Sequence, residues 1–310
     1  MPKFAFRLFA VKIFMVRRKK KKYGGKVVIA LLFAVSIISC YAFINDNAWF
    51  LFRLQTLLAS GHIDESNADG GVSLRELGCD YEELAYAKCL RRRTDEKIVR
   101  HKGYVVSFNR DYKIPNWVGY ELTRTELYGN VPRSDDFAPD PMLEGEGAEL
   151  ADYKYSGYSR GHMAPAADMK WSKEVMTESF YLSNICPQVQ ELNSGDWNEL
   201  ENKVRGWAKR DSAIFVITGP VVGRKAKTIG ENKVAVPDAF FKVILSPFAK
   251  KAEAIGFLME NRQLDRPLRD YAMTVDEIES IAGVDFFYAL PDSVEDEVER
   301  AYDLKYWNLK

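Results

Sequence analysis

The sequence predicts an α+β fold in which helices flank a central antiparallel sheet. Three apolar runs, at 213–218, 240–246 and 254–259, have the length and composition of buried strands. Residues 195–210 instead carry apolar side chains at spacings of three and four, which is typical of an amphipathic helix. Strands and helices follow one another without a regular strand–helix–strand alternation, so a parallel sheet is not expected.

Two shorter segments extend the predicted sheet toward the N-terminus. Residues 104–108 and 117–121 are strand-like, and their separation, with Pro115 and Asn116 between them, suits a hairpin. Residues 126–152 are rich in turn-forming Pro and Gly, which predicts a long functional loop and not a part of the core.

A second helix is predicted near the C-terminus by its end signals. Thr274 and Glu277 have the spacing of a capping box, and Ile278 and Ile281 supply an apolar face. Gly283 stands where the helix would end.

Composition divides the chain into three parts. Residues 1–40 combine six consecutive cations at 17–22 with an uncharged apolar stretch at 27–40, a pattern that predicts a secretory signal. Residues 41–94 are expected to form a linker and a helical lead-in, the latter at 72–95. Residues 95–310 are expected to form the main domain.

Two interpretations of the N-terminus stay open. The residues before Cys40 fit the lipobox that precedes a lipidated cysteine, which would make Cys40 the first mature residue. The alternative is an uncleaved membrane anchor over 27–44, which is barely long enough to span a membrane. For a bacterial chain, both interpretations predict an exported protein of the cell envelope, periplasmic or extracellular, that is tethered to the membrane by its N-terminal lipid or anchor.

The net charge of zero hides an uneven distribution. Residues 1–39 hold ten Lys or Arg and no acid, which leaves 34 cations against 44 acids in the rest of the chain. Such an acidic mature part would not attract nucleic acid over a long range. A locally basic cleft is still compatible with this charge.

The chain has four cysteines, and their number and spacing bear on zinc binding and on disulfide formation. No Cys-x-x-Cys or Cys/His cluster has the spacing of a zinc site. If Cys40 carries lipid, at most one disulfide can form among the remaining three. Cys79 and Cys89 are close enough for a small loop, which an exported protein permits, and Cys186 would then be left over.

The run Ser-Arg-Gly-His at 159–162 holds one of only three histidines and is the first candidate for chemistry. A neutral His162 imidazole can take a proton from water near pH 7. Arg160 is two residues away, where a guanidinium can hold a phosphate. Gly161 would let the backbone turn in a short loop. Because a single histidine is more often structural, the assignment depends on the residues that follow.

Three further polar residues follow some thirty residues later. Asn193 offers a neutral oxygen ligand, and Mg²⁺ needs few protein ligands because it keeps several waters. Glu201 and Arg205 are four residues apart on the predicted helix, a spacing that also fits an ordinary surface ion pair. Together with Asn184, these are the residue types needed to cut a phosphodiester with one hard metal ion.

The order of these motifs resembles the DNA/RNA non-specific endonucleases, the ββα-metal nucleases that include secreted bacterial sugar-nonspecific nucleases and mitochondrial endonuclease G. The family pattern runs D-R-G-H, L-S-N-x-x-P-Q, L-N-x-G-x-W, and L-E with an arginine four residues on. The chain matches it, in order, at 159–162, 182–188, 192–197 and 200–205. Residues 218–220 and 236–244 match further landmarks, so the resemblance covers about 95–290.

By this resemblance, the chain is a Mg²⁺-dependent endonuclease with a ββα-metal fold, and residues 95–310 are its nuclease domain. The catalytic residues would be His162 as general base, Arg160 as a phosphate contact, and Glu201, which would hold a metal-bound water. Asn193 would bind Mg²⁺ directly, with Mn²⁺ as an alternative ion. Substrate binding would use Arg133, Arg205 and Asn184. DNA and RNA are the implied partners, and a homodimer is a further expectation.

One position departs from the family pattern, because Ser159 stands where the family has Asp. A hydroxyl group can still form a local hydrogen bond but carries no charge, so lower activity is expected. Two other functions therefore stay open beside the non-specific nuclease. One is a catalytically weak nuclease-fold protein that binds nucleic acid, and the other is a phosphodiesterase for small phosphate esters.

Overall fold

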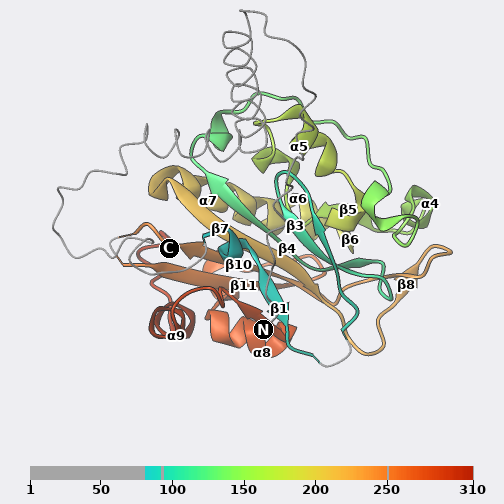
Figure 1. Cartoon of the computed structure of the whole chain (residues 1–310). Coiled ribbons are helices and arrows are strands. Elements are labelled where there is room, and N and C mark those ends of the chain that lie inside the picture. Colours follow the sequence, from blue (N-terminus) through green and yellow to red (C-terminus); the bar gives the residue numbers. More distant parts are fainter. Residues whose placement is uncertain (1–80, 92–93, 250, 310) are drawn as a thin grey trace, which may run out of the picture. The chain divides into compact units, whose positions relative to one another are not determined.

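A seven-stranded sheet forms the centre of the computed structural model, which describes residues 81–91, 94–249 and 251–309 (Figure 1). Every neighbouring pair of strands in it is antiparallel, which confirms the predicted α+β class. From one edge to the other, the strands are β12 (Ala272–Met273), β11 (Glu253–Glu260), β10 (Ala239–Ser246), β7 (Ala213–Val221), β4 (Ile114–Thr123), β3 (Val105–Asn109) and β2 (Lys97–Arg100).

Three short ladders and several helices surround this sheet in the described part of the chain. The ladders pair β1 (Ala87–Cys89) with β13 (Val284–Phe286), β5 (Ser159–His162) with β6 (Ile185–Gln188), and β8 (Thr228–Ile229) with β9 (Val234–Ala235). The α-helices are α4 (Leu150–Tyr153), α5 (Lys173–Glu178), α6 (Gln190–Ser194), α7 (Asp196–Asp211), α8 (Val275–Ala282) and α9 (Asp292–Arg300). The 3₁₀ helices are η1 (Tyr81–Ala85), η2 (Glu126–Tyr128), η3 (Pro141–Leu143), η4 (Ala166–Asp168), η5 (Leu182–Asn184) and η6 (Leu268–Tyr271).

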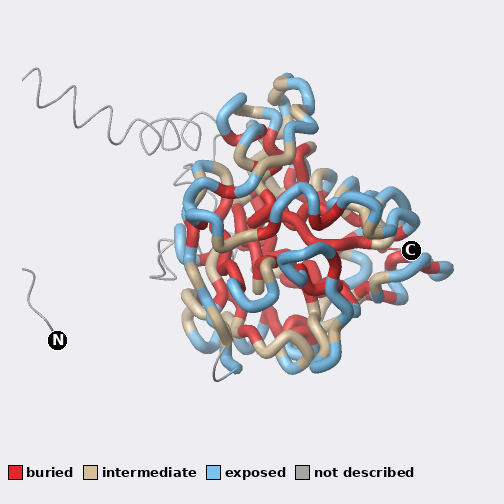
Figure 2. The backbone as a smooth tube through the Cα atoms, turned by 90° about the vertical axis from the view of Figure 1, so that its right-hand side faces the viewer, coloured by how far each residue is buried: buried red, intermediate tan, exposed pale blue. Residues whose placement is uncertain are grey.

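Both faces of the central sheet are buried. Successive residues of a strand point to opposite faces. On β7, Ile214 and Val216 belong to one apolar cluster, and Phe215 and Ile217 belong to another. The first cluster includes the apolar side chains of α7, and the second includes those of α8 and α9. The sheet is therefore the middle of three layers, and Figure 2 shows its strands as buried segments inside exposed turns.

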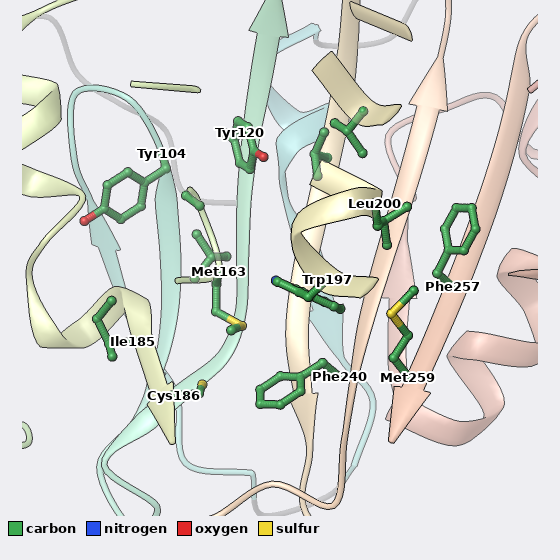
Figure 3. Close-up of a cluster of buried hydrophobic side chains, with 14 of the residues drawn as sticks. Tyr104, Tyr120, Met163, Ile185, Cys186, Trp197, Leu200, Phe240, Phe257 and Met259 are labelled. Carbon is green, nitrogen blue, oxygen red and sulfur yellow. The ribbon is translucent and has the colours of Figure 1, made fainter. Parts of the chain in front are cut away.

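Helix α7 covers the first face with the apolar stripe that the sequence predicted. Trp197, Leu200, Val204 and Trp207 are each at most 4% exposed. The ring of Trp197 lies 5.7 Å from that of Phe240 on β10, and Figure 3 shows both within the core. Truncation of one such leucine to alanine costs about 2–5 kcal/mol. This packing fixes the helix, and with it the polar residues on its neighbouring face.

Helix α8 begins and ends as its sequence predicted. The Thr274 hydroxyl accepts a hydrogen bond from the Glu277 backbone N–H at 3.2 Å, and the Glu277 carboxylate accepts one from the Thr274 N–H at 2.9 Å. Gly283 ends the helix with φ of 69°, a left-handed conformation that glycine adopts without a steric penalty.

The β3–β4 hairpin differs from the prediction at its turn. The chain reverses at 110–113, and Pro115 and Asn116 lie inside β4. Pro115 pairs with Phe108 where the register of the two strands shifts, between Ser107 and Phe108. Such irregularities are where a strand tolerates a residue without an N–H group. The loop expected at 126–152 holds the short helices η2 and η3, the start of α4, and Ala138, which forms an isolated bridge with Tyr181.

The helical lead-in expected at 72–95 is wrong in part. Residues 87–89 form strand β1, which gains its hydrogen bonds from β13, a partner nearly two hundred residues away. Cys89 carries a free thiol, and its Sγ donates to Glu96 at 3.3 Å. Cys79 and the signal, lipobox and anchor segments lie outside the described residues. In the described part, no helix has the length and apolar character to cross a membrane.

Candidate active site

The Ser-Arg-Gly-His run forms strand β5 and not the loop that was expected. Ser159 pairs with Gln188, and His162 pairs with Ile185, across the β5–β6 ladder. Gly161 serves close packing and not a turn, because a Cβ there would lie 2.1 Å from the Gln188 Oε1. The ladder leads directly into α6 and α7, which carry the other predicted site residues.

His162 sits in an apolar, aromatic setting. Its side chain is buried, with ring centroids 5.4 Å from Phe137 and 4.9 Å from Phe180. Its Nε2 has no hydrogen-bond partner among the described residues. Burial, followed by the charges of Arg133 and Arg160, lowers the pKa of His162 to about 3. The imidazole is therefore neutral at pH 7, and its Nε2 is enclosed by the surrounding side chains.

Two exposed guanidinium groups lie beyond the aromatic neighbours of His162. Arg160 stacks on Phe137 with its Cζ 4.0 Å from the ring centroid, and Arg133 lies 4.9 Å from the centroid of Phe180. Arg133 also donates to Asp135 at 2.6 Å. Arginine on an aromatic face keeps its N–H groups free at the edge, where they can bind a phosphate. The structure thus brings Arg133, Arg160 and His162 together.

A hydrogen-bonded chain joins β5 to helix α6. Ser159 Oγ donates to the Gln188 carbonyl at 2.7 Å and accepts from Asn193 Nδ2 at 3.1 Å. Because the single hydroxyl proton is used on the carbonyl, the hydroxyl can only accept from Asn193. This fixes Nδ2 as the near atom and turns Oδ1 of Asn193 away from Ser159. No described residue donates to that Oδ1.

Asn184 is buried and binds the backbone of Ala164, two residues after His162. Its Oδ1 accepts from the Ala164 N–H at 2.9 Å, and its Nδ2 donates to the carbonyls of Ala164 and Ser179 at 2.9 and 2.8 Å. These bonds occupy both polar atoms of the side-chain amide, and Asn184 is 0% exposed. Asn184 therefore positions the site from inside the fold, where the sequence suggested a substrate contact.

Arg205 does not form the surface ion pair with Glu201 that its spacing allowed. Its Nη1 donates instead to Oδ1 of Asp168 at 2.9 Å. Asp168 is 1% exposed and also accepts from the Tyr120 hydroxyl at 2.8 Å. Burial raises the pKa of Asp168, and Arg205 and Tyr120 act against that rise. The result is a partly buried guanidinium held in one orientation.

Glu201 is close enough to a buried cation, missed in the sequence, for the two charges to shift each other's pKa. Lys242 of β10 is 0% exposed and donates from Nζ to the Thr218 hydroxyl on β7 at 2.7 Å. Burial raises the pKa of the half-buried Glu201 carboxyl, and the Lys242 charge opposes that rise. Burial in turn lowers the pKa of Lys242, while Glu201 and Asp168 raise it.

The sequence gives a weak indication for some of the residues that were missed. Lys242 is the single charge in the apolar run 240–246, and a lone cation in a buried strand is rarely accidental. Asp168 likewise follows an apolar segment, but nothing in the sequence pairs it with Arg205. Phe137 and Phe180 gave no signal, because aromatic residues are common in cores.

The donor set fits a hard divalent cation. The free Asn193 Oδ1 is a neutral oxygen ligand of the kind that Mg²⁺ accepts. Among the described residues no hydrogen bond reaches the Glu201 carboxylate, and its pKa is raised by burial. A nearby dication would stabilise the ionised form of such a carboxylate. Two oxygen donors leave room for the waters that Mg²⁺ retains.

The chain is similar to several nucleases of known name. It is 37% identical over 207 residues to "Nuclease EXOG, mitochondrial" of Danio rerio, covering 61% of this chain and 60% of the relative. It is 35% identical over 200 residues to "Endonuclease G, mitochondrial" of Homo sapiens, covering 60% of this chain and 67% of the relative. It is 35% identical to "Nuclease C1" of Cunninghamella echinulata, covering 63% and 84%. The chain thus spans about 60% of the length of its EXOG relatives.

A solved structure supports the same fold. The crystal structure of the EndoG/EndoGI complex contains a chain that matches with a TM-score of 0.60 and 34% identity. The match covers 63% of this chain and 87% of that chain. It confirms the predicted ββα-metal nuclease fold. In this chain, strands β5 and β6 are followed along the sequence by helices α6 and α7.

The expected export to a cell envelope is wrong. The EXOG and endonuclease G relatives are named as mitochondrial proteins and not as proteins of an envelope. The comparisons lend no support to the signal peptide, the lipid anchor or the membrane tether. The positive and apolar N-terminal residues suggested a secretory signal by composition alone, and composition does not specify a destination.

Residues 85–293 match the family described as DNA/RNA non-specific endonuclease. The match contains strands β5 and β6, helices α6 and α7, and the buried Lys242 of β10. It therefore covers each residue of the candidate site. The chain belongs to the DNA/RNA non-specific endonuclease family.

Proposed function

We propose that this protein is a magnesium-dependent endonuclease that hydrolyses phosphodiester bonds of DNA and RNA, with His162 as its general base. The observation that carries the proposal is the His162 ring, which burial keeps neutral and which packs against two aromatic rings that each lie beneath an arginine. Membership of the nuclease family supports the reaction class.

Arg160 and Arg133 would hold the phosphate that is to be cut. Their guanidinium groups lie over the two rings that contact His162 and can form paired hydrogen bonds with phosphate oxygens. The bound phosphate also offsets the two positive charges that lower the pKa of His162. Substrate binding would therefore raise the basicity of the imidazole when a base is needed.

His162 would take a proton from the attacking water at the unprotonated nitrogen of its neutral ring. A base placed in this way accelerates hydrolysis by about 10²–10⁴-fold. Because the ring is neutral in the free protein, no proton has to leave it before the reaction at pH 7. Asn184 would keep the ring in place by fixing the backbone that follows it.

Asn193 would bind Mg²⁺ through Oδ1, and Glu201 would interact with its water molecules. When bound, the ion offsets the negative charge that develops on the phosphate and the leaving oxygen. Mn²⁺ has the same ligand preferences and is the alternative ion. Arg205, oriented by Asp168, would face the same substrate from helix α7.

We assign the activity to residues 95–310, as the motifs suggest. The division at 40 and 94 and the homodimer stay predictions. The non-specificity toward DNA and RNA rests on family membership.

Digestion of three substrates tests the proposal. The full chain is incubated with plasmid DNA, single-stranded DNA and RNA while Mg²⁺ is titrated, with EDTA as the control. Cleavage of all three that depends on Mg²⁺ is the expected result. Binding without cleavage would instead indicate a nuclease-fold binding protein. Hydrolysis of bis(nitrophenyl) phosphate without cleavage of polymers would indicate a small-ester phosphodiesterase.

A further inference from the structure

Three carboxylates converge between helices α8 and α9, on the face of the sheet opposite α7. Asp276 and Glu279 lie one turn apart on α8, and Glu299 lies in the last turn of α9. One ligand oxygen from each residue lies within 4.8 Å of those of the other two. Figure 1 shows α8 and α9 away from β5, β6 and α7, which carry the candidate active site.

Glu299 is an unusual member of this group because it is buried. Glu299 is only 5% exposed, and its Oε1 has no hydrogen-bond partner among the described residues. An ionised carboxylate in this position lowers the stability of the fold unless a cation or a hydrogen-bond donor offsets its buried charge. Burial and the nearby charges of Glu279, Glu295, Asp276 and Asp285 raise the pKa of Glu299 to about 9.

No described cation compensates the three carboxylates. None of them forms a salt bridge with a described lysine or arginine. Lys88 acts on Glu295 and Asp285, and its Nζ lies 3.6 Å above the ring of Tyr288. The positive charge that this group lacks must therefore come from outside the described chain or from protons.

The carboxylates are also held in place. Glu279 Oε1 accepts a hydrogen bond from the Phe286 backbone N–H at 2.7 Å, which fixes that carboxylate toward the start of the α8–α9 connection. Val275, Ile278 and Val298 anchor the two helices in the apolar cluster beneath them. Asp276 is exposed, so water can reach one side of the group.

We propose that Asp276, Glu279 and Glu299 form a binding site for a divalent cation, with Ca²⁺ as the best match. Ca²⁺ takes six to eight oxygen ligands at about 2.3–2.6 Å in flexible geometry. Oxygens on opposite sides of such an ion lie about 5 Å apart, which agrees with the spread of this group. Waters on the Asp276 side would complete the shell. The ion would join the last turn of α9 to α8 and replace the proton on Glu299.

Thermal unfolding of the metal-free full chain, with and without Ca²⁺, tests this proposal independently of nuclease activity. Glu299→Gln and Asp276→Asn each remove one charged ligand. Glu297→Gln is the matched control, because Glu297 lies on the same helix but pairs with Lys251 on the surface. Asn193→Ala removes the proposed ligand of the active site.

We expect Ca²⁺ at up to about 10 mM, above the range of weak calcium sites, to raise the Tm of the wild type, Glu297→Gln and Asn193→Ala. The rise should shrink in Asp276→Asn and disappear in Glu299→Gln. Isothermal titration at pH 7 should find one Ca²⁺ per chain at this site, with proton release that depends on Glu299. The proposal is overturned if the wild-type Tm does not respond, if the response survives in Glu299→Gln, or if only Asn193→Ala removes it.

Discussion

The side-chain amide of Asn193 donates to the hydroxyl of Ser159 at 3.1 Å, and that hydroxyl donates to the Gln188 carbonyl at 2.7 Å. The strand that ends in His162 therefore orients the amide on α6 that we propose as the metal ligand. Ser159 has an aspartate counterpart in the family pattern, and it retains the acceptor that the amide needs without the negative charge.

The first prediction concerns this hydrogen bond. Ser159→Ala removes the acceptor, so Asn193 can rotate and the Mg²⁺ concentration for half-maximal cleavage should rise several-fold. Ser159→Asp keeps an acceptor and adds a charge that attracts the cation, so this concentration should fall below that of the wild type. Mg²⁺ titrations of the three proteins decide the point. A higher requirement in Ser159→Asp would mean that the site has adapted to serine.

The second prediction compares a buried with an exposed ion pair. Asp168→Ala leaves the Arg205 guanidinium without its carboxylate partner and should lower the free energy of unfolding by about 3 kcal/mol. Asp135→Ala breaks the exposed pair with Arg133 and should change it by less than about 1 kcal/mol. Urea unfolding followed by circular dichroism measures both. Equal effects of the two variants would contradict the structural importance of the Asp168–Arg205 pair.

The third prediction concerns Lys242, the buried cation that acts on Glu201. The Lys242 charge lowers the pKa of Glu201 against the effect of burial. Lys242→Met should therefore raise that pKa and move the acidic limb of the kcat/KM profile to higher pH. Thr218→Val is the control, because it removes the hydrogen bond to Lys242 but keeps the charge. Superimposable pH profiles for the wild type and Lys242→Met would show that Glu201 is not the group that titrates.

The fold was predictable where the apolar pattern matched the final packing. Helix α7 followed from the spacing of Trp197, Leu200, Val204 and Trp207, because these side chains face one sheet. Strands β7, β10 and β11 followed from their continuous apolar runs, because both faces of the sheet are buried. The turn near Pro115 was misplaced, since a register shift in the partner strand cannot be inferred from one sequence.

The candidate site was predictable only as a set of residue types. The motifs indicated His162, Asn193 and Glu201, but their surroundings depend on contacts between distant segments. Asp168 lies 37 residues before Arg205 and meets it only through the packing of η4 against α7. The influence of Lys242 on Glu201 likewise depends on the register of β10 against β7, which pairs Lys242 with Thr218. Such relationships require the fold.

The fourth prediction concerns acid stability. The pKa of His162 is about 3 in the folded protein, against an ordinary value of about 6.5 in the unfolded chain. Between these values the unfolded state binds one more proton, so stability falls as the pH falls below about 6.5. His162 contributes up to about 1.4 kcal/mol per pH unit to this slope.

Urea unfolding of the wild type and His162→Gln between pH 7.5 and 4.5 measures this contribution. The stability of the wild type should decline more steeply with falling pH than that of the variant, because glutamine does not titrate. Parallel curves for the two proteins would show that His162 is not held neutral by burial.

The most direct test of the central claim is the cleavage rate of His162→Ala on a defined DNA duplex at pH 7.5 and saturating Mg²⁺, with DNA binding measured in parallel. His101→Gln is the control, because His101 is the other histidine that the structure describes and it pairs with Asp140 at 2.8 Å. If His162 is the general base, kcat should fall by about two to four orders of magnitude while binding is retained. Cleavage near the wild-type rate by a folded His162→Ala protein would contradict the account.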